Sequence, residues 1–315
     1  MTKYIVRRLL QLIPVLLAIT LLSFALLHLA GGDAITYFYE RSGTAVSQEI
    51  IDKAKAVYGL DKPFLVQYLH WLKGMLTGDM GISYVSNKPV FATFVSRLPA
   101  TIMLTISSIV LTLLLALPLG VYSAVRQNSK WDYIIRACTF WGNSLPNFFV
   151  AMVLLYFLAI KLAWLPVMSQ GSTFQGLVLP TLTLAISMAA KYTRQVRAIV
   201  LEELQKDYVV GARARGVRFE VIMMHNILRS SLFALLTLLA LSSGSLLGGT
   251  AIVESIFMWD GVGKLAVEAI VMRDYPLIQA YVVWMSIIYV FVNLLTDIVY
   301  HLLDPRVRLA EVGKL

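Results

Sequence analysis

The stretch Asp207-Tyr-Val-Val-Gly-Ala-Arg-Ala-Arg-Gly-Val217 is a basic, glycine-containing segment set between two long apolar runs. It predicts a helical turn over residues 208–215 that ends at Gly216, because glycine is common just after the last turn of a helix. Small residues in this turn would let another protein approach closely, and arginines would flank that contact with positive charge. The sequence therefore predicts a docking surface that comprises Asp207, Tyr208, Gly211, Ala212, Arg213, Ala214, Arg215 and Gly216.

The composition of the chain is that of a protein with several membrane spans. Of its 315 residues, 58% are hydrophobic and 14% are charged, whereas about a quarter of the residues in a soluble domain are charged. The formal net charge is +9, but the basic residues lie at the ends of apolar runs, where they orient membrane helices. This placement favours contact with the lipid bilayer and not with nucleic acid. The single cysteine, Cys138, excludes an internal disulfide and a multi-cysteine metal site.

Six apolar segments predict an all-α fold with six transmembrane helices. The first follows Lys3, Arg7 and Arg8 and is longer than the apolar core of a secretory signal, so we expect it to remain as a span. Lysine and arginine concentrate on the side that carries the docking surface, which places both termini in the cytoplasm. The segments cover about residues 9–30, 99–125, 134–159, 177–190, 232–253 and 277–303.

Residues 31–98 form a predicted external insert between the first two spans. Apolar residues recur at helical spacing within 50–57 and 65–76, which predicts short helices at the outer membrane surface. The expected organisation is an N-terminal end and first span over 1–30, the insert over 31–98, a five-helix core over 99–303 that contains a cytoplasmic loop over 201–229, and a cytoplasmic tail over 304–315.

Polar side chains within the spans are candidates for a translocation path. An Asn-Ser-Leu-Pro-Asn cluster over 143–147 is costly at membrane depth unless it faces the bundle interior or water. Two interpretations stay open, a helix kink that lines a path and a hydrogen-bonded contact between helices. The fifth segment is rich in serine and glycine, which indicates a closely packed helix. The candidate path residues are Asn143, Ser144, Asn147, Ser242, Ser243, Ser245 and Asn293.

The sequence contains no recognisable catalytic, cofactor-binding or metal-binding constellation. The segment Gly261-Val-Gly-Lys264 lacks the spacing of a phosphate-binding loop. The four histidines are scattered, without the spacing of metal ligands. We therefore expect a transporter subunit and not an enzyme. An ion-coupled secondary transporter is the alternative, but such proteins place ionisable residues at mid-membrane, and Asp297 is the main exception here.

Several motifs resemble a known family. The docking stretch, with His225-Asn-Ile-Leu-Arg229 after it, is similar to the cytoplasmic loop of permease subunits of ABC importers, in particular the first permease of dipeptide, oligopeptide and nickel uptake systems. The resemblance covers nearly the whole chain. Further matching motifs are Gly59-Leu-Asp-Lys-Pro63, Glu254, Phe257, Gly261-Val-Gly263, Arg273-Asp-Tyr-Pro276, Asn293, Asp297 and Asp304-Pro-Arg306.

This resemblance implies a type I ABC-importer permease in the bacterial cytoplasmic membrane. It implies that the docking surface is a coupling helix. The implied partners are a second permease of different sequence, two ATP-binding subunits that hold ATP and magnesium, and an extracytoplasmic substrate-binding protein. For the external insert two interpretations stay open, a structural collar and a contact surface for the substrate-binding protein. ATP hydrolysis by the partners would drive alternating access. The cargo implied is nickel, as ion or chelate, or di- and oligopeptides, and the compact length favours the nickel type.

Overall fold

The computed structural model describes residues 2–29, 36, 47–57, 59–169, 173–229, 231 and 250–303. These residues are mainly helical, and the sole strand-like feature among them is an isolated antiparallel bridge between Ile82 and Pro89. The expected all-α class is therefore confirmed. The chain divides into two compact units, one of residues 1–101 with 260–290 and one of residues 102–259 with 291–315.

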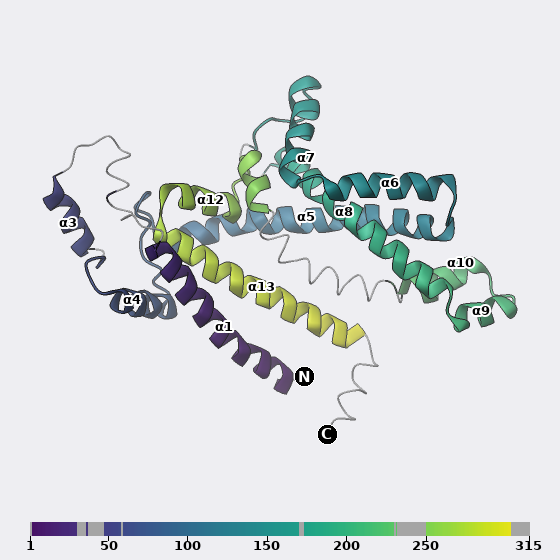
Figure 1. Ribbon diagram of the computed structural model, residues 1–315, viewed down its shortest axis with the longest axis horizontal. Helices are drawn as coiled ribbons and strands as arrows, with labels where there is room; N and C mark the ends of the chain where they lie inside the picture. The colour runs from purple at the N-terminus through teal and green to yellow at the C-terminus, as the bar shows by residue number, and fades with distance from the viewer. Residues whose placement is uncertain are drawn as a thin grey trace. The chain divides into compact units, whose positions relative to one another are not determined.

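Figure 1 shows the described helices coloured in chain order, from purple at the N-terminus to yellow at the C-terminus. They are α1 (Thr2–Leu29), α3 (Gln48–Val57), α4 (Phe64–Thr77), α5 (Val90–Val125), α6 (Lys130–Ser144), α7 (Asn147–Leu154), the π-helix η1 (Leu155–Lys161), α8 (Phe174–Leu204), α9 (Asp207–Ala214), α10 (Phe219–Val221), the π-helix η2 (Ile222–Ile227), α12 (Val262–Met272) and α13 (Tyr275–Leu303).

Three described helices are long and apolar enough to cross a membrane, namely α5, α8 and the part of α13 over Tyr275–Leu295. The pair formed by α6 and by α7 with η1 meets the same test as one bent span. The apolar part of α1 is the shorter stretch Ile13–Leu29. Most of the expected fifth span lies outside the described residues, so the count of six spans stays a prediction.

The expected third span is broken, not merely kinked. Helix α6 ends at Ser144, and the next helix is inclined to it by 104°. Leu145 has an extended backbone, with φ −83° and ψ 131°, because a residue before proline is disfavoured in the helical region. Pro146 then precedes the first turn of α7, where its missing N–H costs no helical hydrogen bond.

Two other predicted helix starts are too late in the chain. Helix α5 begins at Val90 and not near Pro99, because Pro89 supplies the same start signal earlier. Helix α8 begins at Phe174, where the side chain of Thr173 accepts a hydrogen bond from the Gly176 amide. Pro180 therefore lies inside α8.

The insert is anchored to the first helix by aromatic packing. The ring of Phe24 on α1 contacts the rings of Phe64 and Tyr68 on α4, with centroids 5.3 and 5.5 Å apart. The hydroxyls of Thr20 and Tyr68 are hydrogen-bonded at 3.0 Å. Leu65 and Leu69, which belong to the apolar pattern over 65–76, lie on the exposed side of the same helix and do not form this contact.

The second unit has a core in which α5, α8, α9 and η2 meet. Its buried members are Ala116, Ala124, Tyr192, Val196, Val200, Val209, Ile222, Met223 and Ile227. Small residues bring the helices close: a Cβ atom at Gly120 would lie 2.5 Å from the Cβ of Val196, and one at Gly142 would lie 2.9 Å from the Cβ of Ala190. The backbone of α8 therefore approaches those of α5 and α6.

We expect Gly120→Ala to destabilise this unit by about 1–3 kcal/mol, because the added methyl would force α5 away from α8. The Thr193 carbonyl oxygen, 2.9 Å from the added Cβ, cannot move aside as a side-chain end could. Thermal unfolding in detergent measures the effect. Gly211→Ala is the matched control, since no atom lies within 4 Å of its added Cβ. Equal unfolding temperatures for the two variants would contradict the prediction.

Candidate functional site

Helix α9 presents one face to the core and leaves the other free. Val209 is fully buried in the core cluster that also contains Ile222 and Ile227. Val210, Gly211 and the positions after Ala212 are exposed. Ala212 itself is half-buried and packs on the core, so it is less available to a partner than the sequence suggested. The remaining predicted docking residues, Asp207, Tyr208, Gly211, Arg213, Ala214, Arg215 and Gly216, are all exposed.

The helix ends where the sequence predicts, to within one residue. Its last residue is Ala214, and Gly216 follows with φ +77°, a conformation that glycine adopts without strain. The Gly216 amide donates to the Arg213 carbonyl at 2.9 Å, and the Val217 amide donates to the Ala212 carbonyl at 3.1 Å. These bonds satisfy the carbonyls that a helix end leaves open.

Side chains fix both ends of α9 to their surroundings. At its start, the buried carboxylate of Glu203 on α8 accepts from Tyr208 Oη at 2.8 Å and from Lys206 Nζ at 2.6 Å. At its end, the Arg213 guanidinium lies 5.0 Å from the ring centroid of Phe219, within the range of a cation–π contact. The exposed face is therefore held on a rigid base.

A buried ion pair joins α6 to α8. Asp132 is fully buried and accepts two hydrogen bonds from Arg197, from Nε at 2.8 Å and Nη2 at 2.9 Å. It also accepts from Ser123 Oγ at 2.5 Å and from the Asn128 amide at 3.0 Å. The carboxylate is thus fully paired, as burial requires. This pair was not predicted from the sequence, in which the one local signal is the helix start Ser129-Lys-Trp-Asp132.

The structure gathers three candidate path residues at the bend between α6 and α7. Asn143 and Ser144 are exposed in the last turn of α6, and Asn147 is half-buried in the first turn of α7. The Ser144 hydroxyl donates to the Phe140 carbonyl at 2.8 Å, and its oxygen keeps its capacity to accept a hydrogen bond. Asn293 is half-buried on α13. Ser242, Ser243 and Ser245 lie outside the described residues.

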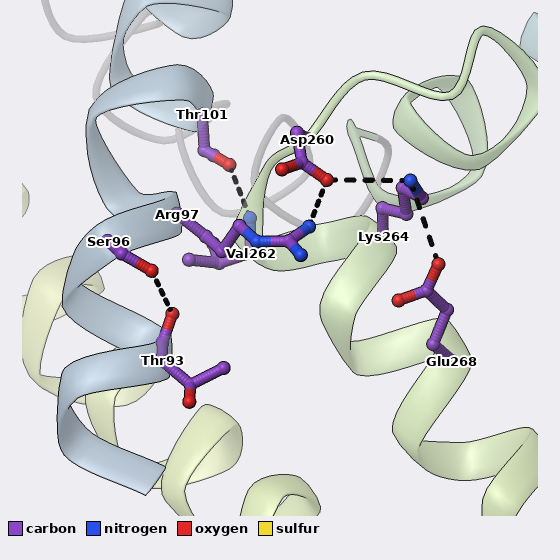
Figure 2. Close-up of polar contacts among 8 residues, drawn as sticks. All are labelled: Thr93, Ser96, Arg97, Thr101, Asp260, Val262, Lys264 and Glu268. Atoms are coloured by element: carbon purple, nitrogen blue, oxygen red, sulfur yellow. Dashed lines mark hydrogen bonds and ion pairs between the residues drawn. The ribbon is translucent and has the colours of Figure 1, made fainter. Parts of the chain in front are cut away.

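In the first unit, a charged cluster links α5 to the start of α12 (Figure 2). Asp260 forms ion pairs with Arg97 and with Lys264, the second at 3.5 Å. Lys264 also lies 3.7 Å from a carboxylate oxygen of Glu268, and the Val262 amide donates to Thr101 Oγ1 at 2.9 Å. The lysine that follows Gly261-Val-Gly263 therefore contacts carboxylates.

A second buried carboxylate fixes the turn before α13. Asp274 accepts from Ser83 Oγ at 2.5 Å and from the Tyr84 amide at 3.2 Å. Burial raises the pKa of Asp274, and these hydrogen bonds offset only part of that effect. Together with the Arg97 cluster, this contact fastens the end of the insert to the segment that leads into α13.

Comparison with known proteins gives full-length relatives. The oligopeptide transport system permease protein AppB of Bacillus subtilis is 38% identical, over 98% of this chain and 100% of its own length. The glutathione transport system permease GsiC is 37% identical in Pectobacterium atrosepticum and 34% in Escherichia coli K12, in each case over 98% of this chain and 99% of the relative. None of these relatives is named for nickel.

A solved structure shares the fold. The inward-facing MetNI methionine ABC transporter aligns with a TM-score of 0.58 at 18% identity, over 67% of this chain and 96% of that one. At this identity the similarity concerns the fold alone, and it confirms the expected ABC-permease fold class.

Two family models together match most of the chain. Residues 1–105 match the N-terminal model of binding-protein-dependent transport system membrane components, and residues 116–309 match the model of their inner membrane component. Permeases of ABC transporters are not ion-coupled, so the alternative of an ion-coupled secondary transporter is wrong. The chain belongs to the family of binding-protein-dependent transport system inner membrane components, the multi-pass permease subunits of ABC importers.

Proposed function

We propose that this chain is the first permease subunit of a peptide-class importer, and that α9 is its coupling helix. The observation that carries this proposal is the exposed face of α9, which combines small and basic residues on a base fixed by Val209 and Glu203. A groove in an ATP-binding subunit would receive Gly211 and Ala214 at close range. Arg213 and Arg215 would then meet acidic side chains at its edge.

Contacts within the second unit would transmit a movement of α9 to the membrane spans. Motion of α9 displaces α8, because Tyr208 and Val209 are fastened to it and to the shared core. Helix α8 in turn carries α6 through the Asp132–Arg197 pair. The movement therefore reaches the bend at Leu145–Pro146, where Asn143 and Asn147 lie. Alternating access would follow from closing and opening the path at that bend.

The expected partners complete the importer. A second permease of different sequence, two ATP-binding subunits that hold ATP and magnesium, and an extracytoplasmic substrate-binding protein would assemble with this chain. Both termini would lie in the cytoplasm of a bacterium, on the same side as α9. The family description names binding-protein dependence, which supports the binding protein as the component that selects the cargo.

Peptides are the cargo class that we propose. The relatives named above are permeases for oligopeptides and for glutathione, itself a tripeptide. Neutral amides at Asn143 and Asn147 suit this class, because a carboxamide both donates to and accepts from a peptide group. The preference for nickel that the chain length suggested has no support in the names of these relatives.

Reconstitution tests the proposal. The chain, its second permease, the ATP-binding subunits and the binding protein are placed in vesicles without an ion gradient, with ATP on the side of the ATP-binding subunits. We expect accumulation of a labelled peptide only with hydrolysable ATP. Calorimetry of the binding protein with glutathione, a dipeptide, an oligopeptide and nickel, with and without a chelator, identifies the cargo. Uptake without the ATP-binding subunits would overturn the mechanism, and binding of nickel alone would overturn the cargo class.

A further inference from the structure

An open cleft of about 470 Å³ lies where α6 packs against α8. Its lining combines three guanidinium groups with two aromatic rings. The lining residues are Tyr133, Arg136, Ala137 and Phe140 on α6, and Arg194 and Arg197 on α8.

Two of the three arginines in this cleft have no ion-pair partner among the described residues. Arg197 is neutralised by the bidentate pair with Asp132. Arg136 and Arg194 are exposed, and neither forms an ion pair with any carboxylate in the part of the chain that the structure describes. The Arg136 guanidinium lies 5.5 Å from the Tyr133 ring centroid, within the range of a cation–π contact. The guanidinium groups of Arg136 and Arg194 are therefore available to bind an anion in this cleft.

The surroundings of the cleft match the boundary between headgroups and acyl chains. Arg194 lies on the last turns of α8 before the docking loop, and Arg136 lies in the second turn of α6. Along the same helix, the rings of Phe140 and Trp141 are 61% and 66% exposed. Such aromatic residues are typical of the membrane interface. An anion held at the arginines would thus have an apolar surface on its membrane side.

We propose that this cleft binds the phosphodiester headgroup of an anionic phospholipid from the inner leaflet. The guanidinium groups of Arg136 and Arg194 would contact the phosphate oxygens, and the Tyr133 hydroxyl would donate to them. The acyl chains would lie along Phe140 and Trp141. Basic pockets between membrane helices on the cytoplasmic side are known to bind such headgroups. A bound phosphate would join α6 to α8 a second time, beside the Asp132–Arg197 pair.

Lipid titration of the purified full-length chain tests this site. The measurement is the shift in unfolding temperature in neutral detergent as phosphatidylglycerol is added, with phosphatidylcholine as the zwitterionic reference. We expect phosphatidylglycerol to stabilise the chain, and the double variant Arg136→Gln/Arg194→Gln to require roughly 30-fold more of it, since each basic residue contributes about 1 kcal/mol. Native mass spectrometry of the same samples counts the bound lipid.

Matched variants separate the site from general charge effects. Arg126→Gln/Arg218→Gln removes two exposed arginines from the cytoplasmic side outside the cleft, and we expect it to bind as the unaltered chain does. Arg136→Lys/Arg194→Lys keeps the charge and should keep most of the preference. Size-exclusion profiles show whether each variant is folded.

Four results would overturn the proposal. They are equal stabilisation by both lipids, equal loss in the two glutamine double variants, stabilisation by inorganic phosphate alone at the same concentration, and disappearance of the lipid preference when the second permease is present. The third result would assign the cleft to a soluble anion. The fourth would assign it to an acidic surface of the partner.

Discussion

Ala214→Trp is expected to abolish ATP-driven uptake while the chain stays folded and inserted. Ala214 is exposed on the free face of α9, so a large side chain there can be accommodated at the surface but prevents close approach by an ATP-binding subunit. Loss of one well-packed contact at the centre of an interface costs about 2 kcal/mol or more, which corresponds to roughly a 30-fold weaker association. Arg215→Glu should act in the same direction, because it reverses charge at the edge of the same face.

Three measurements separate docking from folding in these variants. Co-purification with the ATP-binding subunits should fall, ATP hydrolysis should no longer respond to the loaded binding protein, and the unfolding temperature of the isolated chain should stay unchanged. Ala198→Trp is the control, since Ala198 is an exposed alanine on α8 and is not one of the predicted docking residues. Normal uptake by Ala214→Trp would remove α9 from the docking role.

Asp132→Ala is expected to destabilise the chain by about 3–5 kcal/mol, because it leaves a largely buried guanidinium without its counter-charge. The Arg197 side chain is only 19% exposed, and Ser123 and the Asn128 amide would lose their acceptor as well. Unfolding in detergent, followed by tryptophan fluorescence, measures the change. A shape-filling apolar pair, Asp132→Leu with Arg197→Met, should recover much of the loss, since it removes both charges together.

An exposed ion pair provides the comparison. Lys53 and Glu49 lie 2.7 Å apart on α3, but their side chains are 73% and 75% exposed. Glu49→Ala should therefore cost no more than about 0.5 kcal/mol. A comparable loss for Asp132→Ala would mean that the α6–α8 pair contributes little to stability.

Local features of this fold were predictable from the sequence because local residues determine them. Gly216 marks the end of α9, and the proline at 146 marks a break, since glycine and proline restrict the backbone where they stand. The angle of that break was not predictable, because it depends on how α7 and η1 pack. The start of α5 was also not predictable, because Pro89 and Pro99 are equivalent signals for a helix start.

Long-range pairings were the features that the sequence could not give. Asp132 and Arg197 lie 65 positions apart, and each alone is typical of a solvated loop or helix end. Ala212 belongs to a run of small residues that all look equally exposed, and only the folded structure shows that it packs against the core. The three serines of the fifth span fall outside the described residues, so their place on the path stays a prediction.

Helices α6 and α8 are clamped at two levels, by the Asp132–Arg197 pair at one end and by the contact of Gly142 with Ala190 at the other. Because both contacts would resist a tilt of one helix relative to the other, we expect α6 and α8 to move as one rigid body. The hinge of this motion is then the short linkage at Leu145–Pro146. A displacement of the end of α8 that leads to α9 would therefore appear at Leu145–Pro146 as a rotation about a few backbone torsion angles.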